Sequence, residues 1–83
     1  MSNFSPAQCR AARALIGLNQ PGLAKAAGLG LSTIVDFERE RRAVSPDAAG
    51  AIRQALEASG VIFVDENGEG PGVRLRKSER LRE

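Results

Sequence analysis

The chain has 83 residues, a length that suits one small domain with a single modest core. Charged residues make up 27% and hydrophobic residues 42%, which is typical of a folded, water-soluble protein and excludes a disordered or membrane-spanning one. With one cysteine, Cys9, and no histidine, the composition indicates no intramolecular disulfide, no metal site and no cofactor.

The classes of protein can be narrowed further. No apolar run approaches the length of a membrane span, and the start of the chain lacks the features of a signal peptide, so we expect a cytoplasmic protein. An enzyme has little support, because the chain shows no nucleophile motif and no carboxylates at useful spacing. The glycine-rich stretch at 68–72 lacks the strand, helix and lysine of a phosphate-binding loop.

The net charge of +2 says little about a partner, but the distribution of charge is more informative. Three arginines gather at Arg39, Arg41 and Arg42, and the end of the chain carries a second basic group made of Arg74, Arg76, Lys77, Arg80 and Arg82. Acidic residues lie elsewhere, notably at 65–69. The two basic segments are therefore candidates for contact with phosphate.

The first predicted helix opens at Ser5–Gln8, where a serine cap, a proline and a glutamine have the spacing of a capping box. We expect this helix to run to about Ile16. Its expected core face consists of Ala11, Ala12, Leu15 and Ile16. Cys9 lies near the first turn, and we expect it to pack against Phe4 as a small apolar residue rather than to act as a redox switch.

Two short helices joined by a tight turn are predicted over residues 19–38. Asn19 can cap the first of them, and Gly28 stands where that helix must stop in a left-handed conformation. The second helix begins near residues 30–31 and ends in the charged run 38–42. One apolar seam connects both helices, made of Leu23, Ala24, Ala27, Leu29, Ile34 and Phe37. This pattern is that of a helix-turn-helix, whose second helix enters the major groove of DNA.

A fourth helix is predicted to open at Ser45–Asp47 and to end at Gly60. Its apolar positions are Ala48, Ala49, Ile52, Ala55 and Leu56. The run 61–64 then favours a strand, the stretch 65–72 a turn, and the alternating run 73–76 a returning strand. We therefore expect a mainly α domain over residues 1–83, with about four helices and a C-terminal β-hairpin at about 61–76.

Residues from about 10 to 58 resemble the lambda-repressor-like (Cro and xenobiotic-response-element type) helix-turn-helix family. The resemblance is carried by Arg13, Gln20, Leu23-Ala24, Ala27-Gly28-Leu29, Ser32-Thr33-Ile34 and Phe37-Glu38, in the order and spacing of that family. It implies that Gln20 reaches a DNA phosphate at the start of its helix, the alternative being that it only caps that helix. It also implies a structural ion pair between Arg13 and Glu38.

The outward face of the proposed recognition helix should carry the remaining DNA contacts. Hydroxyls and a methyl-contacting side chain at Ser32, Thr33 and Leu31 can meet base edges, and Asp36 can accept a hydrogen bond from a cytosine. The alternative is that they are solvated surface residues. Resemblance to the family places Arg39, Arg41 and Arg42 near backbone phosphates.

The hairpin suggests a second copy of the chain. All four residues of the first strand, Val61, Ile62, Phe63 and Val64, are apolar, whereas one helical layer covers a single face of a strand. We therefore expect a homodimer in which two hairpins pack or pair, the alternative being a monomer whose hairpin folds against the first and fourth helices.

These features predict a sequence-specific DNA-binding transcriptional regulator, most simply a dimeric repressor that binds double-stranded DNA in the major groove. An alternative from another class is an antitoxin-like or adaptor module that keeps the helix-turn-helix fold and uses its hairpin or basic tail to hold a protein partner. The shortage of long polar side chains on the recognition helix keeps this alternative open.

Overall fold

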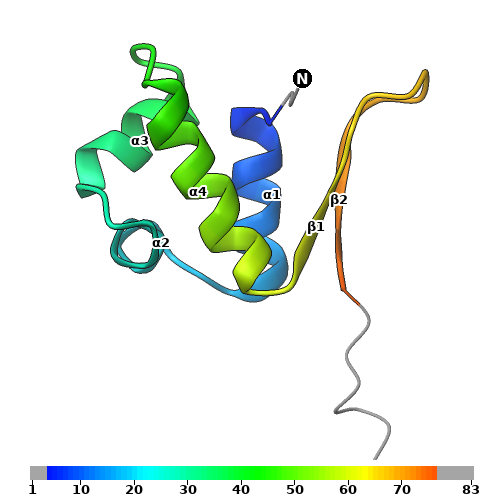
Figure 1. Ribbon diagram of the computed structural model, residues 1–83, viewed down its shortest axis with the longest axis horizontal. Helices are drawn as coiled ribbons and strands as arrows, with labels where there is room; N and C mark the ends of the chain where they lie inside the picture. Colours follow the sequence, from blue (N-terminus) through cyan, green and yellow to red (C-terminus); the bar gives the residue numbers. More distant parts are fainter. Residues whose placement is uncertain (1–3, 77–83) are drawn as a thin grey trace, which may run out of the picture.

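The computed structural model describes residues 4–76. Within that range the chain forms four helices followed by a two-stranded antiparallel hairpin (Figure 1). The elements are α1 (Pro6–Ile16), α2 (Gln20–Ala27), α3 (Leu31–Arg39), α4 (Pro46–Ala58), β1 (Val61–Val64) and β2 (Gly72–Leu75). The fold is mainly α, as the sequence predicts, and no helix of the described part is long and apolar enough to cross a membrane. The predicted charged tail, with Lys77, Arg80 and Arg82, lies outside the described residues.

Local signals set where the helices begin. The predicted capping box of α1 is present, with Ser5 Oγ accepting from the Gln8 N–H at 3.1 Å and Gln8 Oε1 accepting from the Ser5 N–H at 3.0 Å. Asn19 and Ser45 likewise accept backbone N–H groups at the starts of α2 and α4, at 2.7 and 3.1 Å. Each of these three helices has a proline in its first turn, where a missing N–H leaves no hydrogen bond unmade.

The turn between α2 and α3 depends on a left-handed residue. Gly28 has φ +72°, as predicted, and its N–H closes the end of α2 on carbonyl oxygens of the preceding turn. α3 also ends in a left-handed residue, but here it is Glu40, with φ +56°. A side chain in that conformation is less favourable than glycine.

The core lies between the four helices and the inner face of the hairpin. Its buried apolar residues are Cys9, Ala12, Leu23, Ala24, Ile34, Ile52, Leu56, Val61 and Phe63. The predicted seam across α2 and α3 is present in Leu23, Ala24 and Ile34, with Phe37 partly buried beside it.

The predicted core face of α1 is wrong at two of its four positions. Ala11 is exposed and Leu15 is 42% exposed, whereas Gln8 and Cys9 are buried together with Ala12. The helix is rotated relative to the prediction because the hairpin packs along it and supplies hydrogen-bond acceptors for the buried glutamine.

The hairpin packs against α1 and α4, with β1 in contact with both helices and β2 in contact with α1. In the register, Val61 faces Leu75 and Phe63 faces Val73. Val61 and Phe63 point into the core, at 2% and 8% exposure, while Ile62 and Val64 are half-buried on the outer face. This corrects the expectation that all four β1 residues would be available to a second copy, because both helices cover the inner face of the strand.

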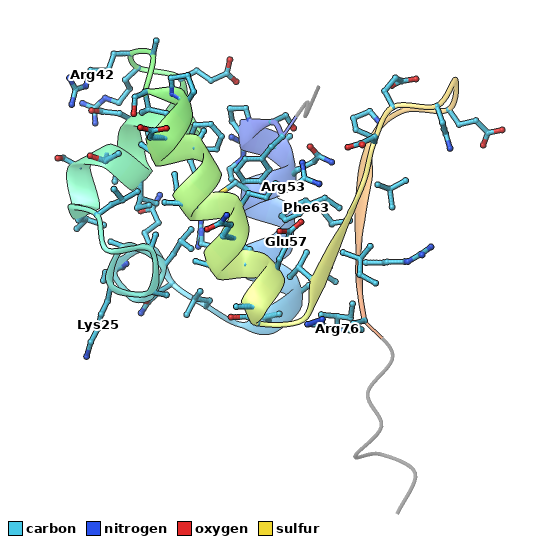
Figure 2. The ribbon with its side chains drawn as sticks, in the orientation of Figure 1. Lys25, Arg42, Arg53, Glu57, Phe63 and Arg76 are labelled. Carbon is cyan, nitrogen blue, oxygen red and sulfur yellow. The ribbon has the colours of Figure 1, made fainter. Side chains whose placement is uncertain are left out.

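Aromatic contacts fasten the hairpin and the start of α1 to the helices. The Phe4 ring stacks on Phe37, with centroids 5.3 Å apart, and meets Phe63 edge to face at 4.9 Å. The Arg53 guanidinium lies 5.2 Å from the Phe63 centroid, between α4 and β1 (Figure 2). Figure 1 shows the hairpin beside α1, on the side of the helices away from α2 and α3.

Candidate nucleic-acid interface

A buried polar cluster stands at the junction of α1, α2 and α3. Its centre is Glu38, 1% exposed at the end of α3. Arg13 of α1 makes a two-point ion pair with it, with Nε 2.6 Å from Oε2 and Nη2 2.7 Å from Oε1. Gln20 Nε2 donates to Oε1 at 2.9 Å, and the Cys9 thiol donates to Oε2 at 3.0 Å. The structure thus brings Arg13 and Glu38 together and adds Cys9 and Gln20 to them.

The contacts of the polar cluster decide its charge state. Burial alone would raise the pKa of Glu38, but the hydrogen bonds from Arg13, Cys9 and Gln20 outweigh burial and hold that pKa below its ordinary value. The hydrogen bond to Glu38 raises the pKa of Arg13 above its ordinary value. Burial, followed by the hydrogen bond to Glu38, raises the pKa of Cys9, so the thiol is a neutral donor and lacks the low pKa of a reactive cysteine.

Gln20 is therefore placed differently from either sequence interpretation. Its amide does not cap α2, because Asn19 performs that role, and it is turned toward the Glu38 carboxylate rather than outward. The contact joins the first residue of α2 to the end of α3. The relative position of the two helices is thereby fixed by a charge-assisted hydrogen bond as well as by the apolar seam.

A shallow groove lies beside the polar cluster, and we call it the cationic groove. Its walls are formed by Arg10, Arg13, Asn19, Gln20, Pro21, Glu38 and Arg39. Glu38 balances the charge of Arg13, which leaves the charges of Arg10 and Arg39 in excess. The groove brings together two predicted DNA-binding residues, Gln20 and Arg39, and it can accommodate an anion such as a phosphate.

Arg10 is the groove residue that the sequence interpretation missed. Its side chain donates to the backbone carbonyl of Glu38, so it lies at the same junction as Arg13. The spacing of three residues between Arg10 and Arg13 places them on one face of α1, a signal that was available in the sequence.

The positive character of the groove comes from these arginines more than from the start of α2. Asn19 already takes the Gly22 N–H, and Pro21 has no N–H to offer. The partial charge of the helix end is therefore a smaller feature of this groove than the guanidinium groups.

The exposed start of α3 is a separate surface with short side chains. Leu31 is 46% exposed and Ser32 is exposed, while Thr33 and Asp36 are half-buried. The N-cap residue of this helix, Gly30, provides no side-chain hydrogen bond. The predicted base-reading residues thus lie at and just after the helix start, and two of the four are freely accessible.

Asp36 is not an isolated carboxylate. Arg42 Nε lies 2.6 Å from its Oδ2, and the Arg42 side chain is 68% exposed. The pair reduces the repulsion that a lone carboxylate would exert on phosphates. Arg39 and Arg41 are exposed nearby, and Figure 2 shows Arg42 and Lys25 on the side of the molecule that carries α2 and α3.

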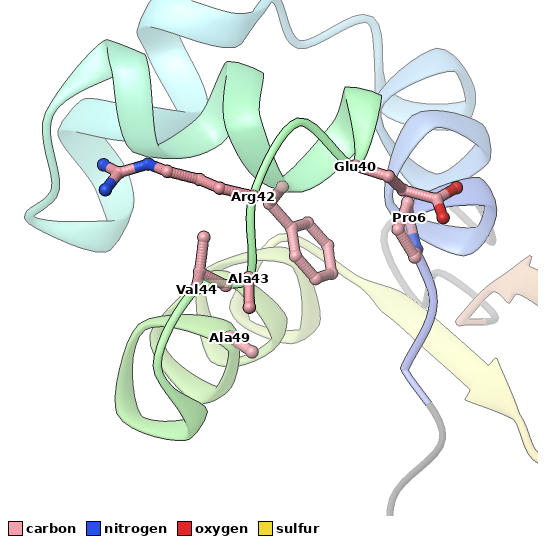
Figure 3. Close-up of a pocket in the computed structure, with 7 residues that line it drawn as sticks. Pro6, Glu40, Arg42, Ala43, Val44 and Ala49 are labelled. Atoms are coloured by element: carbon pink, nitrogen blue, oxygen red, sulfur yellow. The ribbon is translucent and has the colours of Figure 1, made fainter.

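An apolar pocket that the sequence did not indicate lies between the start of α1 and the α3–α4 loop (Figure 3). It is lined by Pro6, Phe37, Glu40, Arg42, Ala43, Val44 and Ala49. Only its two charged residues offer polar groups, so its surface suits an apolar contact rather than acid–base chemistry.

Among residues 4–76 no group of three or more His, Cys, Asp or Glu side chains is placed to hold a metal ion. A scan against protein-family models and a search of curated proteins both found no match for this chain. The interpretation of the site therefore depends on its geometry.

Proposed function

We propose that this chain is a DNA-binding transcriptional regulator of the lambda-repressor-like helix-turn-helix type, acting as a dimer and most simply as a repressor. The observation that carries the proposal is the locked α2–α3 pair, which has a cationic groove at one junction and the exposed start of α3 beside it. In this proposal α3 enters the major groove, with Leu31, Ser32 and Thr33 toward the base edges.

The basic residues have a different role in the same proposal. Arg10 and Arg39 contact one backbone phosphate at the cationic groove, and Arg41 contacts another. Asp36 serves mainly to orient Arg42, through the 2.6 Å ion pair. Phosphate contacts of this kind give affinity without base specificity and make binding strongly dependent on salt.

A binding assay on the full chain tests the proposal. Selection from random double-stranded DNA, followed by titration at several salt concentrations, should yield a site with two related half-sites roughly 34 Å apart. Arg39→Ala should weaken binding to all sequences and reduce the salt slope by about one unit. Arg74→Ala, an exposed arginine on the hairpin, is the matched control and should bind as the wild type does.

Two results would reject DNA binding as the function. One is the absence of binding even at low salt. The other is equal loss of affinity in Arg39→Ala and Arg74→Ala, which would indicate nonspecific attraction to a basic protein.

The alternative of a protein-interaction module has one structural observation in its favour, the apolar pocket beside Phe37. An antitoxin-like or adaptor protein would seat a partner's apolar side chain there. Ala49→Glu, at the wall of that pocket, would then abolish partner binding, whereas under the DNA proposal it should leave DNA affinity unchanged.

A further inference from the structure

The outer edge of β2 has backbone groups directed away from the hairpin. Within the described residues β2 has a strand neighbour on one side only. The Arg76 N–H donates to the Gly60 carbonyl at 2.6 Å, and because antiparallel pairs alternate, Gly72 and Arg74 also direct their backbone groups toward β1. Val73 and Leu75 therefore direct theirs to the outer edge, where another strand can pair with them.

The surface next to this edge is apolar. A groove between α1 and β2 is lined by Ser5, Ala7, Gln8, Ala11, Pro71, Gly72 and Val73. Leu15 continues the α1 wall one turn after Ala11, and Leu75 continues the β2 wall two residues after Val73. Leu15 and Leu75, at 42% and 49% exposure, are two of the three exposed large hydrophobic side chains in residues 4–76.

Charge along the hairpin distinguishes between possible occupants. Its tip is acidic, with Asp65, Glu66 and Glu69, and its other end is basic, with Arg74 and Arg76. Antiparallel pairing of two identical β2 strands brings the basic end of each beside the acidic tip of the other. The hairpin is thus electrostatically complementary to a second copy of itself.

We propose that two copies of this chain pair through the outer edges of their β2 strands, antiparallel about a two-fold axis at Val73. The result is a four-stranded sheet in the order β1-β2-β2-β1 that packs across both α1 helices, with Leu15 and Leu75 covered at the junction. An axis at Val73 sets Arg74 opposite Gly72 of the second copy and Arg76 beside its Glu69. An axis at Arg74 would set two arginines directly opposite each other, which is unfavourable.

This pairing is compatible with the DNA-facing surface. The hairpin lies on the side of α1 and α4 away from α2 and α3, so the pairing leaves the start of α3 uncovered in both copies (Figure 1). The inference rests on the proposed function only in its need for two copies, and the pairing itself can be measured without DNA.

The test is the solution mass of the full chain, measured by sedimentation equilibrium without DNA from micromolar to submillimolar concentration. We expect a mass near twice 8.8 kDa for the wild type. Leu75→Lys and Leu15→Lys should each shift the mass toward 8.8 kDa, because each buries a charge in the apolar junction. Leu31→Lys alters a leucine of similar exposure on α3 and should remain dimeric. Circular dichroism confirms that each variant is folded.

A charge-reversal pair tests the register and does not depend on the leucine variants. Arg76→Glu should weaken the dimer at least several-fold, and Glu69→Arg in the same chain should restore it, because the two positions meet only between copies. A monomeric wild type, or a dimer unaffected by Leu15→Lys and Leu75→Lys, overturns the proposal. Failure of the double variant to recover overturns the axis at Val73. A dimer that does not bind DNA removes the proposed function and leaves this inference standing.

Discussion

The side-chain amide of Gln8 joins α1 to both strands of the hairpin, with Nε2 donating to the Gly72 carbonyl at 2.9 Å and to the Val64 carbonyl at 3.3 Å. The same side chain accepts from the Ser5 N–H through Oε1. Gln8 is only 5% exposed, so water contributes little to its hydrogen bonding. One buried amide therefore completes the start of α1 and holds the hairpin against it.

Gln8→Ala should lower the free energy of unfolding by about 2 kcal/mol, because it removes the capping contact and leaves two strand carbonyls without their partner. Urea denaturation measures this change. Gln8→Glu is the informative comparison, since its carboxylate would face two carbonyl oxygens and should destabilise the chain more at neutral pH than in mild acid. A loss below about 0.5 kcal/mol for Gln8→Ala would mean that the contacts contribute nothing beyond an ordinary surface substitution.

Arg13 and Glu38 should behave as a coupled pair in a double-mutant cycle. Arg13→Ala leaves a carboxylate at 1% exposure without its cation, and we expect a loss of about 3 kcal/mol or more in the free energy of unfolding. The double variant Arg13→Ala with Glu38→Ala should lose less than the sum of the single changes. Additive losses would show that the two-point contact stabilises neither partner.

Acid should remove part of the stability through Glu38. Burial disfavours its charged form, but the hydrogen bonds from Arg13, Cys9 and Gln20 prevail, so its pKa in the folded chain lies below the unfolded value of about 4.3. A carboxyl of this kind stabilises the fold above the unfolded pKa and loses that contribution as the pH falls through the folded pKa. The unfolding free energy of the wild type should therefore decrease below about pH 4.3 more steeply than that of Glu38→Gln. Parallel pH profiles for the two proteins would contradict this assignment.

Two glycines should respond in opposite directions to alanine. Gly50 is exposed within α4, and no atom lies within 4 Å of a Cβ added there, so Gly50→Ala should stabilise the chain by about 0.5–1 kcal/mol. Gly28 also has open space around it, but its φ of +72° makes Gly28→Ala unfavourable by about 1 kcal/mol. Thermal melts of both variants separate space from conformation. Destabilisation by Gly50→Ala would show that α4 needs a glycine there.

The features that could be predicted from the sequence are those that neighbouring residues determine. Ser5 and Gln8 form a capping box within one turn, and Gly28 ends α2 through its own backbone freedom. The rotation of α1 could not be predicted in this way, because it depends on carbonyl groups 56 and 64 residues later in the chain. A glutamine is expected at the surface until the partners that permit its burial are known.

The candidate site follows the same division. The resemblance to a helix-turn-helix family led to the pairing of Arg13 with Glu38, but not to the contacts of Cys9 and Gln20 with the same carboxylate. Those contacts satisfy acceptor positions that remain after the arginine has bound, and their geometry arises only when three helices meet. Arg10 was missed for a simpler reason, since its three-residue spacing from Arg13 was not considered.

The burial of Cys9 also makes it an internal clock for the protein. It is the single thiol of the chain, it is fully buried, and its raised pKa keeps it protonated in the folded state. A thiol-alkylating reagent can therefore label the chain only when α1 separates from α3, and the labelling rate counts those openings. Without any engineered probe, the unmodified protein can report how strongly a ligand or a second copy holds its helices closed.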